Sequence, residues 1–351
     1  MILRKNTGTD TEIKLKDNPK ILFIALNGIG NLIILTPAFT NIKKNLPKSR
    51  VSVLALIDSV DVVKDNPYVD EVIVYPAKKS LFSRIMFLLR LRHKKYDISF
   101  YPYPNVNIMS AVMAFLIGAK YRINFYYKFL NRWVGMFDTI SVPVNLNKHD
   151  VEKNLDLIRE LNLKIYSKNL FINITKEDKK YVDSLLKNKV QRNDILVGMH
   201  VGSKEGMRIW PTENFAYLVE KLLHYRRIKI VLIGTSIESK LIRNFEQFKQ
   251  LNVINLIKKT SIPQTTYLIK KCKLFITTDS GPMHMAVAAR TKVIAIYLGP
   301  HIKRTAPFGK EHIAFITDKS TRNEDQNKNH VYVDEIMPEM ILEQVEKSLR
   351  F

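Results

Sequence analysis

The sequence predicts an α/β protein with two doubly wound domains, each a parallel sheet covered by helices on both faces. Short apolar segments alternate with longer segments whose apolar residues recur at helical spacing, and this alternation runs through two series. The chain has 351 residues, enough for two domains of ordinary size. A polar stretch near 165–180 separates the two series.

The first series begins at Lys20, after a polar, non-periodic segment (1–19) that we expect to be a flexible arm. The expected strands are 21–26, 50–57, 69–75, 96–101 and 121–124. The expected helices are 29–44, 82–92, 106–117 and 149–161. The start of the first helix is ambiguous, because Thr36-Pro37 also makes a good N-cap followed by a first-turn proline.

The second series follows the same alternation, and we place the two domains at 20–170 and 171–335. The expected strands are 195–200, 228–233, 253–256, 274–277 and 293–297. The expected helices are 181–189, 212–224, 237–249, 261–271, 283–289 and 338–349. Residues 320–331 are predicted to form a polar loop before the last helix.

Charge is the strongest signal in the composition, with 56 Lys and Arg against 33 Asp and Glu and a net charge of +23. Between Val72 and Phe137 the only acidic residue is Asp97. This distribution indicates a basic face on the first domain that suits an acidic substrate or an anionic membrane surface, although a merely solvated basic face is the simpler alternative. The sequence has no recognisable nucleic-acid-binding motif, so nucleic acid is not an expected partner.

Other features of the sequence limit the cellular location and the chemistry that we expect for the protein. No apolar run reaches the length of a membrane span, and the N-terminus lacks the pattern of a signal peptide. Cys272 is the single cysteine, which gives neither a disulfide framework nor a metal cluster. We therefore expect a cytoplasmic protein without a metal or other cofactor.

Three strand-to-helix turns carry the candidate chemistry. The first, "LNGIGNLIILTP", has Gly28 and Gly30 but Ile33 where a dinucleotide fingerprint needs its third glycine. A dehydrogenase is therefore disfavoured, and an ordinary tight turn remains an alternative. The second, "TTDSGPMHMA", places Asp279, Ser280 and Gly281 before a helix whose free N–H groups suit a diphosphate, with His284 in its first turn. The third, "HVGSKEGMRIWP", adds Ser203 and Arg208 as partners for phosphate oxygens.

Together these segments resemble the family 9 glycosyltransferases, which include the ADP-heptose:lipopolysaccharide heptosyltransferases. The resemblance runs in order from about residue 21 to 308 and includes "GIGNLIILTPAF", "HDVEKNLDLIREL", "MRIWPTENFAYLV", "DSGPMHMAVA" and "YLGPHIKRTAPFG". It implies the glycosyltransferase B-type architecture, with two Rossmann-like domains facing across a cleft. The N-terminal domain would bind the acceptor and the C-terminal domain the nucleotide-sugar. The last helix, in 336–351, would pack back on the N-terminal domain.

The resemblance also implies roles for individual residues. In the donor site, Ser203 and Arg208 would meet the diphosphate, and Gly234 and Glu238 would lie near the nucleotide. Asp279 would contact the sugar, while Ser280, Gly281 and His284 would contact the phosphates. Because no metal is expected, these groups would have to stabilise the charge of the leaving diphosphate.

Three positions depart from the family pattern. Arg208 stands where lysine is usual, which keeps the positive charge. Lys258 stands where glycine is common. The family turn usually reads Gly-Asp, and its Asp is the presumed general base, whereas this chain has Gly30 followed by Asn31. Asn31 cannot take up the acceptor proton, and a general base typically contributes about 10²–10⁴-fold to the rate.

The resemblance therefore predicts an inverting, metal-independent glycosyltransferase on the cytoplasmic face of the inner membrane. It would transfer a sugar, heptose by analogy with the family, from a nucleotide-sugar such as ADP-heptose to lipopolysaccharide core or another cell-envelope glycan. The acceptor would be an acidic or phosphorylated glycolipid. The alternative is a catalytically impaired paralogue that binds nucleotide-sugars but lacks the usual base, and the donor, acceptor and linkage stay open at the level of sequence.

Overall fold

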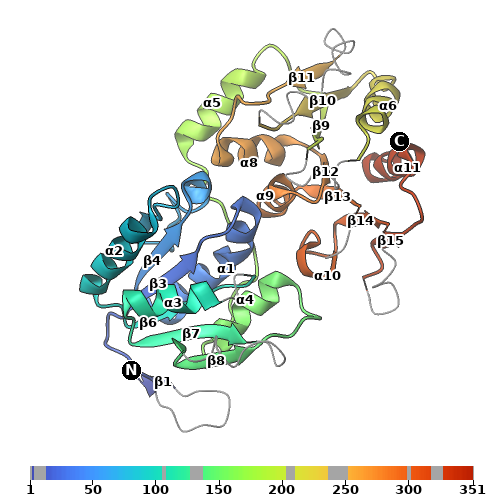
Figure 1. The fold of residues 1–351 in the computed structure, drawn as a ribbon. Helices are drawn as coiled ribbons and strands as arrows, with labels where there is room; N and C mark the ends of the chain where they lie inside the picture. The colour runs from blue at the N-terminus through green and yellow to red at the C-terminus, as the bar shows by residue number, and fades with distance from the viewer. Residues whose placement is uncertain are drawn as a thin grey trace. The chain divides into compact units, whose positions relative to one another are not determined.

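The computed structural model describes residues 2–3, 13–104, 108–126, 137–202, 210–235, 252–298, 302–317 and 327–350. The chain folds into two compact units, Met1–Asn173 and Ile174–Phe351 (Figure 1). This division lies close to the predicted boundary after residue 170. Each unit contains a parallel sheet with helices packed on it, so the predicted pair of doubly wound domains is confirmed.

The sheet of the first unit has the strand order β5-β4-β3-β6-β7-β8. Its strands are β3 (Lys20–Ala25), β4 (Arg50–Ala55), β5 (Glu71–Val74), β6 (Ile98–Phe100), β7 (Tyr121–Tyr126) and β8 (Ile140–Pro143), all parallel. Its helices are α1 (Ile29–Asn45), α2 (Leu81–Leu91), α3 (Ile108–Ile117) and α4 (Asp150–Arg159), with short 3₁₀ turns η1 (Ile57–Val62) and η2 (Arg92–Lys94). Helix α1 packs against α4 and η1, and α2 packs against α3. Strand β8 is not among the strands expected from the sequence.

Helix α1 begins at Ile29, so the ambiguity about its start is resolved and Pro37 lies inside the helix. Proline has no N–H, which leaves the carbonyl of Ile33 without its usual helical donor. The hydroxyl of Thr36 donates to that carbonyl at 2.6 Å. The same hydroxyl accepts a hydrogen bond from the backbone N–H of Phe171 at 2.9 Å. A buried side chain thus repairs the defect that proline introduces.

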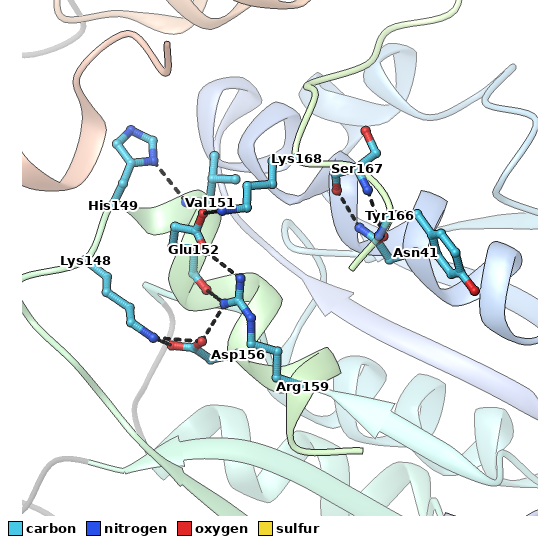
Figure 2. A network of polar contacts seen from close by, with 10 residues as sticks. All are labelled: Asn41, Lys148, His149, Val151, Glu152, Asp156, Arg159, Tyr166, Ser167 and Lys168. Carbon is cyan, nitrogen blue, oxygen red and sulfur yellow. Dashed lines mark hydrogen bonds and ion pairs between the residues drawn. The ribbon is translucent and has the colours of Figure 1, made fainter. Parts of the chain in front are cut away.

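The segment leading out of the first unit runs antiparallel to α1 and is held by the polar side chains of that helix. The amide of Asn41 donates to the carbonyl of Ser167 at 2.6 Å and accepts from the N–H of Tyr166 at 2.6 Å (Figure 2). Asn45 makes an equivalent pair of bonds with Lys164. These contacts explain how α1 can be buried on every side from Leu32 to Ile42 despite carrying polar residues.

The N-terminal arm is part of the first unit, at least from residue 13. Strand β2 (Ile13–Lys14) pairs antiparallel with β1 (Ile2–Leu3), and the side chains of Ile13 and Leu15 are buried. The N–H of Lys14 donates to the Tyr121 hydroxyl at 3.1 Å. The prediction of a flexible arm over 1–19 is therefore wrong for 13–19, because two apolar side chains in a polar segment find a core. Residues 4–12 lie outside the described part of the chain.

The sheet of the second unit has the strand order β11-β10-β9-β12-β13-β14-β15, again wholly parallel. Its strands are β9 (Ile195–His200), β10 (Ile228–Leu232), β11 (Val253–Asn255), β12 (Leu274–Thr278), β13 (Lys292–Tyr297), β14 (Ile313–Ile316) and β15 (His330–Tyr332). Its helices are α5 (Lys176–Leu186), α6 (Thr212–Leu223), α8 (Ile262–Lys271), α9 (Gly281–Ala289), α10 (Ile302–Thr305) and α11 (Pro338–Leu349). The predicted helix at 237–249 lies outside the described residues, and β15 begins within the predicted loop 320–331.

The last helix, α11, packs on the second unit. Its side chains Ile341 and Val345 are fully buried in a core that includes Leu218 and Leu222 of α6. The indole N–H of Trp210 also donates to the carbonyl of Ile336, just before the helix, at 2.9 Å. The expectation that 336–351 packs back on the N-terminal domain is wrong, because the apolar face of α11 is buried against α6.

Lys258 follows β11 in a left-handed backbone conformation, with φ of 62°. Its N–H donates to the carbonyl of Gly234, which follows the neighbouring strand β10. A left-handed residue with a Cβ costs about 1–2 kcal/mol, and glycine avoids this cost. The backbone therefore gives a physical reason for the glycine that is common at this position in the family that the sequence resembles.

Replacing Thr36 by Val should lower the free energy of unfolding by about 2 kcal/mol, because two buried hydrogen bonds are lost without a change of shape. Urea unfolding followed by circular dichroism measures this change. Thr40→Val is the matched control, since Thr40 is buried in the same helix and its hydroxyl makes no bond with the described residues. Equal destabilisation by both variants would contradict the role given to Thr36.

Replacing Lys258 by Gly should raise the free energy of unfolding by about 0.5 kcal/mol, since relief of the left-handed strain exceeds the entropy that glycine loses on folding. The neighbouring exposed Lys259 has no positive φ, so Lys259→Gly should destabilise the protein. The measurement is the denaturation midpoint of both variants. A lower midpoint for Lys258→Gly would show that the lysine side chain has a stabilising contact that outweighs the strain.

Candidate active site

In each sheet, consecutive strands of the chain are first added on one side and then on the other. The point of this reversal defines the candidate site region of each unit. In the first unit the reversal lies between β3 and β6, and in the second it lies between β9 and β12. Ligands of open α/β sheets bind outside the carboxyl ends of the strands at such a switch point, because the chain leaves the two neighbouring strands toward opposite faces. The predicted turns after β3 and β12 lie at these two positions.

In the first unit, the turn after β3 leads directly into an uncapped helix. Gly28 is the N-cap of α1, has an ordinary extended φ of −66°, and provides no side-chain cap. A Cβ at Gly28 would meet no atom within 4 Å, and Gly30 already lies in the helix. The backbone and its surroundings therefore do not require glycine at position 28. Its missing side chain leaves open space beside the N–H groups of α1.

Asn31 lies in the first turn of α1 and is half-exposed. No acidic residue lies in that turn. The positive end of the helix dipole therefore has no negative side chain beside it. The turn favours binding of an anionic ligand and contains no carboxylate that could accept a proton. The structure thus places Asn31 inside the first turn of α1, after β3 at the switch point of the first sheet, and its predicted place in the family's base position stays a prediction.

The loop after β6, on the other side of this switch point, is fixed by α4. The N–H of Tyr103 donates to the side-chain oxygen of Asn154 at 2.9 Å. The Lys153 ammonium lies 4.2 Å from the centre of the Tyr103 ring and 2.9 Å from a carboxylate oxygen of Asp150. Both charged side chains are almost completely buried, so removing either one would leave the other as an uncompensated buried charge. Sequence reasoning missed this arrangement, because it depends on the packing of α4 beside a distant loop.

The outer face of α4 carries a network of ion pairs (Figure 2). Arg159 contacts both Asp156 at 2.6 Å and Glu152 at 2.7 Å. Lys148, two residues before the helix, also contacts Asp156 at 2.7 Å and so ties the preceding loop to the second turn of α4. At the helix start, Nδ1 of the half-exposed His149 accepts from the N–H of Val151 at 3.1 Å. The start of α4 is thereby held in place.

In the second unit, Asp279 and Ser280 connect β12 to α9, and Gly281 is the first residue of the helix. Ser280 is the N-cap by position, but its hydroxyl does not cap the helix. Instead it donates to the carbonyl of Thr278 at 3.2 Å and contacts the Thr277 hydroxyl at 3.1 Å. The first N–H groups of α9 are therefore not capped by this side chain and suit an anion.

His200 joins the two strands at this switch point. It is the last residue of β9, is only 4% exposed, and lies opposite Thr277 of β12 in the register. Its Nδ1 lies 3.2 Å from the Ser280 hydroxyl. The same ring nitrogen lies 3.5 Å from the Thr277 hydroxyl, so His200 contacts both hydroxyls at the end of β12. Sequence reasoning assigned His200 no role, and the only signal for it was its place at the end of a strand before a loop of small and polar residues.

The remaining predicted residues are placed as follows. His284 lies in the first turn of α9 and is buried, with 4% of its surface exposed. Gly234 follows the end of β10 with φ of 154°, a conformation that favours glycine. Ser203, Arg208 and Glu238 lie outside the described residues. The described part of the second unit thus brings together Asp279, Ser280, Gly281 and His284, with His200 as an addition.

Among the described residues, no group of three or more His, Cys, Asp and Glu side chains is arranged to hold a metal ion. Within the same part of the chain, no helix is both long and apolar enough to cross a membrane.

Comparison with known proteins identifies the group to which the chain is related. The model of glycosyltransferase family 9 (heptosyltransferase) matches residues 84–333. The chain belongs to this family. It is therefore a glycosyltransferase, as the sequence predicted, and the matched segment includes the switch point of the second sheet.

Individual relatives are similar along nearly their whole length. Lipopolysaccharide heptosyltransferase 3 of Escherichia coli is 24% identical over 339 residues, which cover 91% of this chain and 96% of the relative. A family 9 glycosyltransferase structure from Veillonella parvula superposes with a TM-score of 0.80 at 21% identity, over 95% of this chain and 97% of that one. The E. coli ADP-heptose lipopolysaccharide heptosyltransferase II structure has a TM-score of 0.74 at 19% identity, over 94% and 98%. These structures support the glycosyltransferase B-type fold with two Rossmann-like domains.

If the turn before α9 binds a nucleoside diphosphate, as proposed below, replacing His200 by Ala should weaken the binding of ADP by about tenfold, because the Ser280 hydroxyl loses a hydrogen-bond partner and the turn loosens. His200→Asn retains a hydrogen-bonding side chain near that position and should lose less. Isothermal titration with ADP measures both. His312→Ala is the matched control, since His312 is another buried histidine of this unit and precedes β14 at the opposite edge of the sheet. Unchanged ADP binding in His200→Ala, or an equal loss in His312→Ala, would contradict the role of His200.

Proposed function

We propose that this glycosyltransferase transfers heptose from ADP-heptose to a lipopolysaccharide-core or related cell-envelope glycan, with inversion at the sugar carbon and without a metal ion. The observation that carries the proposal is the turn from Asp279 to His284 at the switch point of the second sheet, within the segment that matches the family. The curated relative named above is a lipopolysaccharide heptosyltransferase, and this supports the choice of sugar and acceptor.

The donor would bind to the second unit, with its diphosphate at the start of α9. The N–H groups there and the helix dipole are directed at the position where negative charge develops as the sugar leaves. Ser203 and Arg208 would add a hydroxyl and a guanidinium to the diphosphate, and Gly234 and Glu238 would lie near the nucleotide. Asp279 would hold the sugar. The positioned donors and cations would perform the task that a metal performs in other transferases.

The acceptor would bind to the first unit at the switch point of its sheet, beside the open space at Gly28 and the start of α1. A phosphorylated or acidic glycolipid fits this end of α1, since the first turn contains no acidic residue. The basic stretch from Val72 to Phe137 belongs to the same unit and supports this choice. We place the enzyme in the cytoplasm, on the inner face of the inner membrane, where such an acceptor is made.

The catalytic weakness of this site lies at Asn31. An inverting transfer removes a proton from the acceptor hydroxyl while that oxygen attacks the sugar carbon, and the diphosphate leaves with the bonding electrons. An Asn side chain can orient the hydroxyl by a hydrogen bond, but it cannot accept the proton. We therefore propose a slow transferase in which the proton passes to solvent or to the leaving group.

Replacing Asn31 by Asp should raise kcat by about 10²-fold and leave the KM for the donor unchanged, because only proton transfer in the transition state is affected. The measurement is release of ADP from ADP-heptose in the presence of lipopolysaccharide-core acceptors, with other nucleotide-sugars for comparison. Asn27→Asp is the matched control, since it adds the same charge before the helix, to the same connection between β3 and α1.

Three outcomes of this experiment are informative. Wild-type turnover that rises with Asn31→Asp supports the proposal. Substantial wild-type turnover unchanged by the substitution would show that another group is the base. Tight ADP binding without turnover in either protein would overturn the proposal in favour of a paralogue that only binds nucleotide-sugars.

A further inference from the structure

Four large apolar side chains are exposed at the beginnings of two neighbouring helices of the first unit. Leu81 and Phe82 begin α2 and are 60% and 74% exposed. Ile108 and Met109 begin α3 and are 50% and 55% exposed. We call these four residues the apolar rim. Water-exposed side chains of this size in one place are unusual for a surface without a partner.

The topology brings the two halves of the rim together. Helices α2 and α3 pack against each other and bury their inner faces in one core, which includes Leu88 of α2 and Ala114 of α3. They follow β5 and β6, two strands of one parallel sheet, so both helices begin at the carboxyl edge of that sheet. The turn after β3 lies at the same edge. The rim therefore borders the region where we place the acceptor.

Positive charge lies directly beside the rim. Lys78 and Lys79 are exposed and precede Leu81 by only a few residues. Neither lysine is ion-paired with another described residue. The only acidic residue from 72 to 137, Asp97, is 7% exposed and accepts from the N–H of Lys20 at the opposite edge of the sheet. Asp58 and Asp61 of η1 are also exposed, but η1 packs on α1, whereas α2 packs on α3.

Exposed apolar side chains next to unpaired lysines are the combination that binds to the interface of an anionic bilayer. The apolar groups gain free energy by leaving water, and the cations are attracted to acidic headgroups. We propose that the apolar rim, with Lys78 and Lys79, is the surface by which the first unit docks on an anionic membrane. This inference rests on the proposed function for its purpose, which is to let the acceptor reach the start of α1 without leaving the bilayer.

The test is cosedimentation with vesicles of phosphatidylcholine, with and without phosphatidylglycerol. We expect binding only when phosphatidylglycerol is present, and weaker binding at high salt. The double variants Leu81→Ser/Phe82→Ser and Lys78→Glu/Lys79→Glu should each lower the partition coefficient by about tenfold or more. All four positions are exposed, so these variants should keep their fold. Arg84 is left unchanged because its Nε atom is shielded from solvent.

Two controls match the size and charge of these changes elsewhere on the chain. Tyr166→Ser removes an aromatic ring that is 50% exposed and flanked by Lys44 and Lys164, beside the C-terminal half of α1. Lys187→Glu/Lys189→Glu reverses two exposed charges after α5 in the second unit. Neither control should change vesicle binding. Equal losses in the controls and the rim variants would overturn the proposal in favour of a non-specific attraction of this basic protein to anionic lipid.

The remaining outcomes separate docking from catalysis. Rim variants that lose vesicle binding but turn over a detergent-solubilised acceptor at the wild-type rate support the inference. Vesicle binding that depends on the rim in a protein without transferase activity would leave the docking surface standing and overturn only the proposed function. Absence of wild-type binding would overturn the docking surface. So would rim variants that bind vesicles normally but change the sedimentation of the free protein, since the rim would then be an interface between copies of the chain.

Discussion

The order of the strands in the two parallel sheets is the constraint on which the rest of the structure depends. Parallel neighbours need crossover connections, and these are right-handed, so a strand order that grows in both directions from one strand sends its connections to opposite faces. The reversal lies between β3 and β6 in one unit and between β9 and β12 in the other. The loops at these places diverge, and the N-terminus of a helix follows directly, α1 in the first case and α9 in the second.

Buried polar groups make these places rigid. Thr36 supplies the donor that Pro37 cannot, and Asn41 bonds the segment that leads out of the first unit. In the second unit, His200 and Ser280 connect the ends of two neighbouring strands. Loss of a partner would lower the stability of the fold, because each of these groups lies away from water. The same bonds that satisfy these groups therefore also fix the backbone from which a substrate would be held.

The two units differ in the functional groups that the turns at their switch points contain. The turn before α9 combines a helix start without a capping serine and a serine fixed by its neighbours, and we propose it as the diphosphate site. The turn before α1 is also uncapped, but it has Asn31 and no acidic residue. In the function that we propose, this turn would attract an anionic acceptor but could not take a proton from it, so the loss at Asn31 would fall on the rate and not on binding.

The sequence by itself determined the α/β class, the two series of elements and the turn from Asp279 to His284, because these follow from local periodicity and from residue types that act within one turn. The tertiary structure decided what depends on distant partners. It decided that α1 starts before Pro37, that α11 packs on α6, and that 13–19 belong to the first unit. It also gave His200 a role, since that role exists only because β9 pairs with β12. A local pattern cannot specify which surface will bury a side chain, and that choice is made only when the sheets form.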